Sequence, residues 1–214
     1  MSTITYVTDF ARRERLALAD LLDRVGPDEP TLCAGWTTRD LAAHLVVRDR
    51  RPDATAGMLI PPLREHGERV RLAKAAQPFE TILREVRTPP WWSLISNPLT
   101  DELANLGEFF IHHEDVRRAR PGWEPRALDA GQERSIWRAA KLAGRLGLRR
   151  LGVPVSVRAA GFGSFEVGDD PQVTVVGPPG ELALFFFGRQ SAARVAVDGP
   201  ADLAERLRTA RLGS

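Results

Sequence analysis

The sequence predicts an α+β protein in which an N-terminal helical bundle is followed by a small α/β domain. From Tyr6 to about Arg149, apolar residues recur with the three- and four-residue spacing of amphipathic helices. After Gly152 the chain changes to short runs of β-branched residues bounded by Gly, Pro or Asp. A chain of 214 residues is long enough to bury a full core. We therefore predict a helical bundle over residues 1–150 and an α/β domain over residues 151–214.

The first two helices have clear end signals. Apolar residues spaced along 10–25 predict the first helix, and Gly26-Pro27 ends it. Thr37 is a plausible N-cap for the second helix, because Asp40 stands three positions later as the acid of a capping box. The apolar face of this second helix includes the position of His44, so we expect that histidine to point inward.

Three further helices complete the predicted bundle. Residues 63–86 form a charged pattern with apolar positions at helical spacing, which predicts one helix. Prolines across 89–98 predict a loop. Thr100 or Asp101 then begins a fourth helix that runs to about Ala119, and residues 128–148 form a fifth. Four or five antiparallel helices are typical of a bundle.

The C-terminal part contains both strands and helices. The predicted strands are 153–159, 165–167, 173–176 and 195–197. Residues 181–188 and 201–209 have helical patterns between and after these strands. A segment of about sixty residues is small for an autonomous domain. We expect it to depend on the bundle.

Composition narrows the possible cellular setting. Hydrophobic residues make up 43% and charged residues 27% of the chain, as in ordinary globular proteins, and no apolar run approaches the ~20 residues that cross a bilayer. The first residues are neither basic nor apolar, so no export signal is visible, and the single cysteine, Cys33, cannot form an internal disulfide. Thirty basic residues are interleaved with twenty-eight acidic ones, without a basic stripe. These features predict a cytoplasmic protein with no membrane and no nucleic acid as partner.

One stripe of the fourth predicted helix carries titratable residues. At ~100° per residue, the stripe contains Asp101, Glu108, His112 and Asp115 between apolar neighbours. Such a stripe is costly unless its members are solvated, paired or bound to a metal. Together with an inward-pointing His44, residues Glu108 and His112 make a His, Glu, His set, which open catalytic zinc sites use. The alternatives are an ordinary Glu108–His112 pair on a helix surface and a hydrogen-bonded His44 in the core.

Neighbouring residues have expected supporting roles. His113 lies one residue further round the helix, so we expect it to pack or to pair with a nearby carboxylate. Asp40 and Asp115 stand about one turn from His44 and His112, and both are candidates for acceptors that orient the imidazoles. Asp40 is alternatively only a helix cap.

Three segments together resemble a known family. Residues 31–45, TLCAGWTTRDLAAHL, resemble the G-W-T-x-x-D-L-x-x-H-L element of DinB-like proteins, in the branch of mycothiol-dependent maleylpyruvate isomerases. Residues 108–115, EFFIHHED, look like the E-x-x-x-H-H-x-D helix of that family. Residues 176–189, VGPPGELALFFFGR, are similar to its C-terminal segment. The three segments span most of the chain, and their combination is more specific than any one of them.

The resemblance implies a fold, a metal and a chemistry. It implies a DinB-like up-and-down four-helix bundle followed by a small α/β domain related to sterol-carrier-like folds. It also implies a divalent metal, usually zinc, bound by His44, Glu108 and His112. Some members of the family use mycothiol or another small thiol, and others are known only as metal-binding proteins.

A metal-bound thiol would act as a nucleophile at neutral pH. A metal with three protein ligands lowers the pKa of a bound thiol, and the thiolate can then add to an electrophilic small molecule for isomerisation or S-transfer. Arg189 or Arg194 is a candidate catalytic residue that holds a substrate carboxylate, although surface ion pairs explain most arginines. Cys33 is a candidate nucleophile, but no local base is evident in the sequence, and unpaired cysteines are often small buried hydrophobes.

Two other classes of function remain open in the sequence. One is a non-catalytic metal-binding or regulatory module, in which Phe185-Phe186-Phe187 would be a partner surface instead of core. The other is a bundle whose histidines are only structural. The expected partners of the enzyme are a small thiol and an electrophilic substrate, and a homodimer is left open as the assembly.

Overall fold

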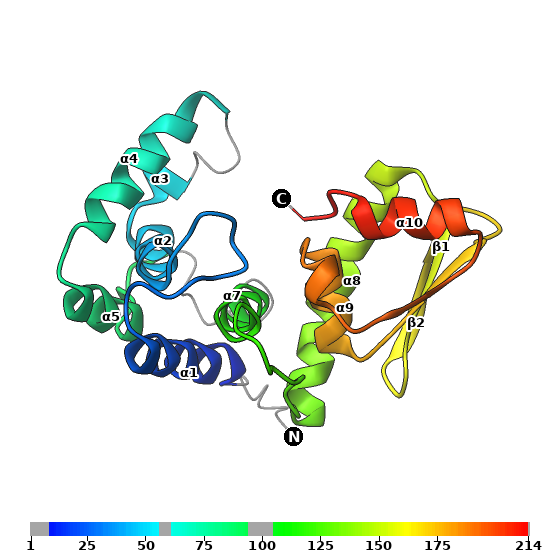
Figure 1. Ribbon diagram of the computed structural model, residues 1–214, viewed down its shortest axis with the longest axis horizontal. Helices are drawn as coiled ribbons and strands as arrows, with labels where there is room; N and C mark the ends of the chain where they lie inside the picture. The colour runs from blue at the N-terminus through cyan, green and yellow to red at the C-terminus, as the bar shows by residue number, and fades with distance from the viewer. Residues whose placement is uncertain (1–8, 56–60, 94–104, 214) are drawn as a thin grey trace, which may run out of the picture. The chain divides into compact units, whose positions relative to one another are not determined.

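The computed structural model describes residues 9–55, 61–93 and 105–213, and these form two compact units. The first unit extends to Trp123 and the second begins at Glu124. Figure 1 shows both units, with the sheet confined to the second. The described chain is therefore mixed α+β and mostly helical, as the sequence predicts.

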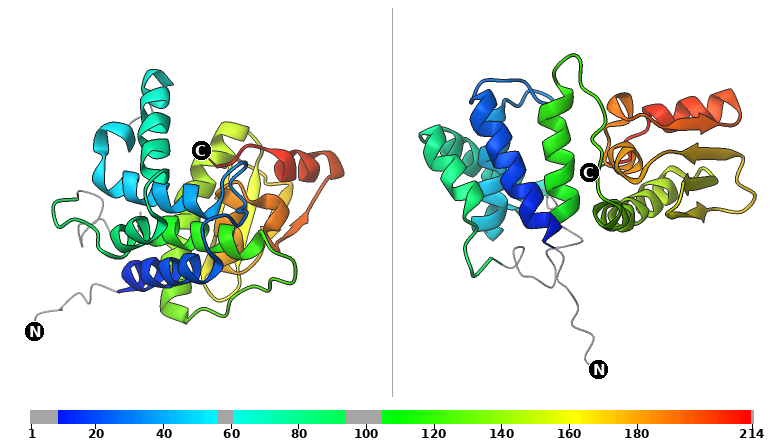
Figure 2. Two further views of the ribbon diagram at one scale, coloured as in Figure 1. Left: turned by 60° about the vertical axis from the view of Figure 1, so that its left-hand side comes forward. Right: turned by 90° about the horizontal axis from the view of Figure 1, so that it is seen from below.

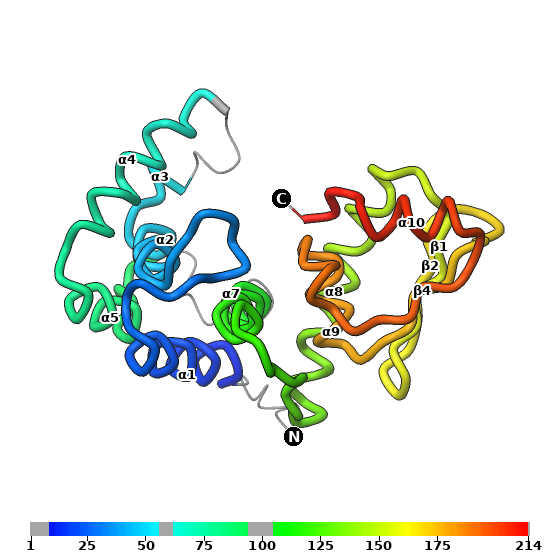
Figure 3. The backbone as a smooth tube through the Cα atoms, in the orientation of Figure 1, coloured from blue at the N-terminus to red at the C-terminus, as the bar shows by residue number. Residues whose placement is uncertain are grey.

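The first unit is helical. Its elements are α1 (Phe10–Val25), α2 (Thr38–Arg50), α3 (Pro52–Thr55), η2 (Pro61–Leu63), α4 (Arg64–Ala75), α5 (Phe79–Arg87) and α7 (Leu106–Arg118). The tube in Figure 3 follows their order along the chain. A single β-bridge between Pro30 and Thr37 is the only strand-like pairing in the described part of this unit. The start predicted for the fourth helix, at residue 100 or 101, lies outside the described residues.

The predicted ends of α1 and α2 are confirmed. Gly26 follows α1 with a φ of 85°, a left-handed conformation that glycine adopts without steric cost. Thr37 and Asp40 form the predicted capping box at the start of α2, each accepting a hydrogen bond from the backbone of the other. The local signals in the sequence were sufficient at these two ends.

The predicted helix over 63–86 is wrong in one respect, because the structure divides it. α4 ends at Ala75, and Pro78 occupies the N-cap position of α5. Proline has no backbone N–H and disfavours helical conformation in the residue before it. The break at this proline lets α4 and α5 take different directions and pack separately against α2.

An apolar core holds the first unit together. In Figure 2, α1 and α7 run side by side, and His113 of α7 pairs with Glu14 of α1. The core residues come from α1, α2, α5 and α7, and they include Leu18, Leu22, Leu41, Leu45, Ile82, Leu83, Phe109 and Val116. Because α2 and α7 both contribute buried faces to this cluster, polar residues on the same two helices are brought close to each other.

The second unit packs helices against a four-stranded sheet. Its elements are α8 (Ala130–Leu151), β1 (Val155–Ala159), β2 (Gly163–Val167), β3 (Val173–Val176), α9 (Pro179–Phe186), η4 (Gln190–Ala192), β4 (Ala196–Asp198) and α10 (Ala201–Thr209). The strand order is β2-β1-β3-β4, with β1 and β3 parallel and the other pairs antiparallel. Strands therefore occur only after Gly152 within the described residues, as predicted.

The boundary predicted near residue 150 differs from the observed division at Trp123 and Glu124. The reason is α8, which packs against α9 and β2 and so belongs to the second unit. Its close approach depends on Gly144, where an added Cβ would lie 2.8 Å from the Phe165 ring and 3.0 Å from the Phe186 ring. A helical pattern alone does not reveal which neighbour a helix covers.

The phenylalanines of α9 are core residues. Phe185 is 1% exposed and Phe186 is fully buried, with their ring centroids 5.5 Å apart. Their use as a partner surface, one of the alternatives raised by the sequence, is therefore contradicted. None of the described helices has both the length and the apolar character needed to cross a bilayer.

Candidate metal centre

Two helices of the first unit supply the three predicted metal ligands. His44 lies in the middle of α2 and is 6% exposed, so it does point inward as predicted. Glu108 stands in the first turn of α7, and His112 follows one turn later at 8% exposure. The buried side chains of Phe109 and Val116 anchor α7 in the core and orient this stripe towards α2.

The three side chains converge on a common point. The Nε2 atoms of His44 and His112 each lie 3.2 Å from the same carboxylate atom, Glu108 Oε1. All three donor atoms lie within 4.8 Å of one another. Two donors 3.2 Å apart, each ~2.1 Å from one ion, subtend about 100° at it, between octahedral and tetrahedral angles. The donor types and their spacing thus fit zinc or a similar divalent ion.

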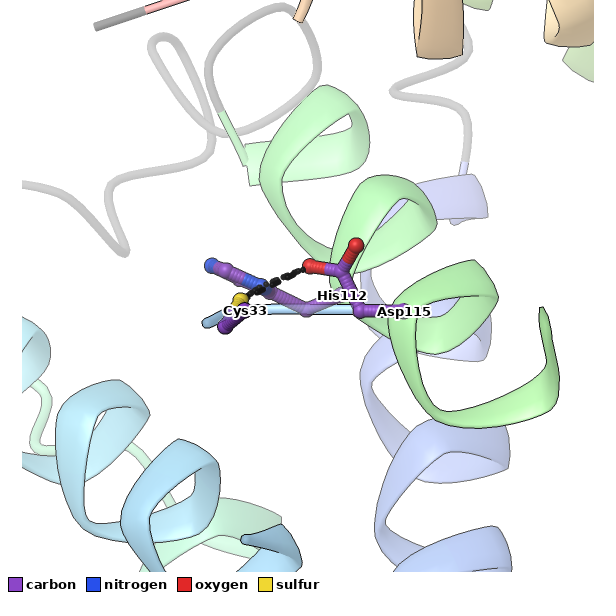
Figure 4. Close-up of side chains that lie close together, drawn as sticks. All are labelled: Cys33, His112 and Asp115. Carbon is purple, nitrogen blue, oxygen red and sulfur yellow. Dashed lines mark hydrogen bonds and ion pairs between the residues drawn. The ribbon is translucent and has the colours of Figure 1, made fainter. Parts of the chain in front are cut away.

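A second group of possible ligands shares His112. Cys33, in the loop before α2, lies beside His112 and Asp115 of α7, and Figure 4 shows the three side chains together. The Cys33 thiol donates to Asp115 Oδ2 over 3.2 Å, and its sulfur lies 4.0 Å from His112 Nδ1. The loop is tied to α7 by the backbone, because Leu32 N–H donates to the Asp115 carbonyl at 3.0 Å.

His112 thus lies between two carboxylates that act on its opposite ring nitrogens. Its Nδ1 is 2.9 Å from Asp115 Oδ2, and its Nε2 faces Glu108. Asp115 is fully buried and already accepts from the Cys33 thiol, so a proton on Nδ1 satisfies it. That tautomer leaves the Nε2 lone pair free for a metal, which is the usual arrangement of a metal-binding histidine. The predicted orienting role of Asp115 agrees with this geometry.

Protonation of the metal-free site follows from the same contacts. Burial lowers the pKa of His112, but hydrogen bonds with Asp115, Cys33 and Glu108 outweigh burial and hold it well above its ordinary value. Burial raises the pKa of Glu108, yet hydrogen bonds from His112 and His44 hold it well below the ordinary value. Burial dominates at His44 and lowers its pKa. The metal-free site is therefore a His112–Glu108 ion pair beside a neutral His44.

Asp40 does not orient His44. Its carboxylate caps α2 through Thr37 and binds Arg71 Nη1 at 2.6 Å. In the described part of the chain, no hydrogen-bond partner lies near His44 Nδ1. The ring of Trp36 packs against His44 instead, with centroids 5.2 Å apart. Of the two readings that the sequence allowed for Asp40, the helix cap is the one observed.

Arg48 is a neighbour of the site that was not predicted from the sequence. It stands one turn after His44 on α2, with Nε 3.5 Å from Glu108 Oε1. Its Nη1 donates to Asn105 Oδ1 at 2.6 Å, which fixes the guanidinium beside the carboxylate. The i, i+4 spacing from His44 was a usable signal for Arg48. Cys33 offered no comparable signal, since only the fold brings it to α7.

The remaining predicted residues lie elsewhere. His113 Nδ1 is 2.8 Å from Glu14 Oε1, so it pairs with a carboxylate as expected. Arg189 and Arg194 belong to the second unit, where Arg189 Nη1 donates to the Phe187 carbonyl and Arg194 Nη1 lies 2.7 Å from Glu124 Oε2. Their substrate-binding role stays a prediction.

In comparisons with protein-family models, curated proteins and solved structures, nothing matches the chain.

Proposed function

We propose that the first unit binds one divalent transition metal, zinc in the first instance, through His44, Glu108 and His112. The observation that supports this most directly is the convergence of three donor atoms within 4.8 Å, from two helices and from residues 64 positions apart. An isolated i, i+4 pair on one helix is commonplace, but a third donor facing the same carboxylate oxygen is not explained by helix geometry. Asp115 supports the proposal because it holds the His112 ring from behind.

We further propose that the bound metal serves thiol chemistry on an electrophilic small molecule, either isomerisation or S-transfer, as in the DinB-like, mycothiol-dependent branch that the sequence resembles. Three protein ligands leave coordination positions open, and a divalent ion there lowers the pKa of a small thiol such as mycothiol. The chain's own contribution is to hold the ligands and to add positive charge. Arg48 lies beside Glu108 and favours an anionic thiolate at the site over a neutral thiol.

The proposed reaction balances without an oxidant. The thiol loses its proton to solvent, a carbon–sulfur bond forms at the electrophilic carbon, and the displaced π electrons take up a proton at the adjacent carbon. Retention of the sulfur completes S-transfer. Rotation about the new single bond, followed by loss of a proton to solvent and departure of the thiolate, restores the double bond and completes isomerisation.

A non-catalytic metal-binding module is the second candidate. The observation that favours it is the burial of the ligands, since His44 and His112 are only 6% and 8% exposed. A structural or regulatory metal needs no substrate access. The first candidate requires that a thiol reach the metal past the partly exposed Glu108 side chain, which is 26% exposed.

Metal stoichiometry tests the shared part of both candidates. We expect wild-type protein to hold about one metal per chain by elemental analysis after dialysis, and Glu108→Gln and His112→Ala to lose most of it. Glu65→Gln, which neutralises an exposed carboxylate of α4, is the matched control for charge. Equal metal content in all four proteins would refute the site.

Thiol binding separates the two candidates. A Co(II)-loaded chain should develop thiolate-to-metal charge-transfer absorption when mycothiol or another small thiol is added, and the Glu108→Gln variant should not. Turnover is then measured with a panel of electrophiles. A metal-loaded protein that shows neither the absorption change nor a calorimetric signal with any thiol would leave the metal-binding module as the function.

A further inference from the structure

A second concave site lies on the first unit, away from the three ligands. It encloses about 510 Å³ between α2, α4 and α5. That volume is within the range of small-molecule sites, ~300–1,000 Å³. Its lining residues are Val46, Val47, Arg50, Arg51, His66, Arg69, Val70, Ala73, Lys74, Gln77 and Glu85. We call it the α2–α4 pocket. In Figure 1, α2 and α4 are neighbours within the same unit, and Arg71 of α4 donates to Asp40 of α2 at 2.6 Å.

The wall of the α2–α4 pocket carries more positive than negative charge. Four permanently charged side chains line it, those of Arg50, Arg51, Arg69 and Lys74. Two carboxylates offset them: Glu85, in the wall, and Asp53, which binds Arg51 at 2.8 Å. Lys74 Nζ forms an ion pair with Glu85 at 3.0 Å, so the charge of that carboxylate is largely neutralised. Two positive charges remain in excess before His66 is counted. A cavity with such an excess attracts anions.

Two arginines of the wall have incompletely paired guanidinium groups. The buried Nε–H of Arg50 makes no hydrogen bond within the described residues, although it lies 3.5 Å from Glu85 Oε2. The Arg69 guanidinium has no hydrogen bond, ion pair or ring contact in the part of the chain that the structure describes. Arg69 is exposed and the Arg50 side chain is 30% exposed, so an anion in the pocket can reach both guanidinium groups.

Apolar residues of α2 and α4 also line the pocket. Val46 and Val47 are 1% and 3% exposed and form part of its floor, and Val70 and Ala73 of α4 also line it. Val70 is partly exposed and Ala73 is exposed, and a bare inorganic ion would leave both in contact with water. An organic anion would pair with the cations through its charged end and cover Val70 and Ala73 with its body.

We propose that the α2–α4 pocket binds a small organic anion, a carboxylate or a phosphate monoester with an apolar body. The charged group binds Arg69 and Arg50, and the apolar group packs on Val70 and Ala73. This site is independent of the proposed metal, because none of the three metal ligands lines it.

The test is calorimetric titration of the full chain with phenyl phosphate, benzoate and benzyl alcohol, before and after removal of metal by a chelator. Both anions share the aromatic body of the neutral alcohol, so the comparison isolates the charge. We expect at least one anion to bind with and without metal, more weakly at high salt, and the alcohol to bind at least tenfold more weakly than that anion. Preference for phenyl phosphate identifies a phosphate monoester as the ligand class, and preference for benzoate identifies a carboxylate.

Substitution locates the binding. Arg69→Gln should weaken anion binding by about tenfold, whereas Arg64→Gln, which removes an exposed arginine from the same helix outside the pocket, should leave it unchanged. Val70→Ala should weaken binding of the aromatic anion as well. Equal losses in Arg69→Gln and Arg64→Gln, equal binding of alcohol and anions, or binding that vanishes with the metal would each overturn the proposal.

Discussion

At the scale of single residues, His112 is the point on which the candidate metal centre depends. Its two ring nitrogens face different carboxylates, Asp115 through Nδ1 and Glu108 through Nε2. An imidazole held on both sides loses little rotational freedom when a metal binds. The same contacts stabilise its protonated form, so a metal must compete with a proton for Nε2.

This competition predicts a pH dependence of metal binding. The pKa of His112 is raised well above 6.5 in the metal-free protein, so the imidazole is protonated at neutral pH and must lose that proton to bind metal. Metal affinity should therefore rise with pH until His112 titrates, and about one proton should be released per ion at pH 7. Competition titrations across pH 6–9 measure the first effect, and calorimetry in buffers of different ionisation enthalpy measures the second. Affinity that is flat across this range would contradict the assigned protonation state.

Substitutions of Asp115 and Cys33 distinguish a residue that orients His112 from a residue that binds the metal. Asp115→Asn removes the carboxylate that holds Nδ1, and we expect metal affinity to fall by about 10- to 100-fold. Cys33→Ser keeps a donor towards Asp115, so metal affinity should stay within about twofold of wild type. Chelator competition with the two variants provides the measurement. A large loss in Cys33→Ser would instead make the sulfur a ligand, in the alternative group of Cys33, His112 and Asp115.

At the scale of elements, the assignment of α8 is the main difference between pattern and structure. Its buried residues include Ile136, Trp137, Ala140 and Leu148, an ordinary amphipathic stripe that suits either a bundle or a sheet. Gly144 is the residue that permits close contact with β2 and α9. For α8, the position of Gly144 thus indicates which elements the helix packs against, whereas the helical period indicates only that one face is buried.

Gly144→Ala tests this packing. Alanine is favoured over glycine inside an isolated helix by about 1 kcal/mol. Here its Cβ would lie 2.8 Å from the Phe165 ring, and overpacking of this kind typically costs about 1–3 kcal/mol. We expect a net loss in the free energy of unfolding, measured in urea. Leu142→Ala, at a half-exposed position of the same helix, should change it by no more than about 0.5 kcal/mol. A more stable Gly144→Ala protein would show that α8 packs less closely.

At the scale of the whole molecule, the division into two units confines the proposed metal chemistry to the first. All three ligands, together with Asp115, Cys33 and Arg48, precede Trp123, and so does the apolar core that holds α2 and α7. The helix α8, which follows Trp123, belongs to the second unit and packs against β2 and α9.

A truncation experiment follows from this division. A fragment of residues 1–123 should fold and bind one metal with an affinity close to that of the full chain, because it retains every ligand and the core. A fragment of residues 1–150 should be less soluble, since it carries most of α8 without the sheet and α9 that cover Trp137 and Ile136. Circular dichroism, metal content and light scattering compare the two. A soluble 1–150 fragment and an unfolded 1–123 fragment would place the boundary near residue 150 instead.

The sequence by itself determined the parts of this protein that depend on local chemistry. The capping box of Thr37 and Asp40, the end of α1 at Gly26, the change to strands after Gly152, and the inward face of His44 all follow from short-range rules. The set of His44, Glu108 and His112 could also be predicted from the sequence, because Glu108 and His112 share one helix face and His44 lies on the buried face of another helix.

Only the tertiary structure decided which faces meet. Packing of α2 against the core next to α7 brings His44 to Glu108 over 64 residues of chain, and the tie between Leu32 and Asp115 brings Cys33 to His112. The break at Pro78 separates α4 from α5 and shapes the α2–α4 pocket. Gly144 allows α8 to pack closely against β2 and α9. Helical periodicity specifies a buried side without specifying what buries it, so long-range contacts of this kind are set by side-chain shape in the folded core.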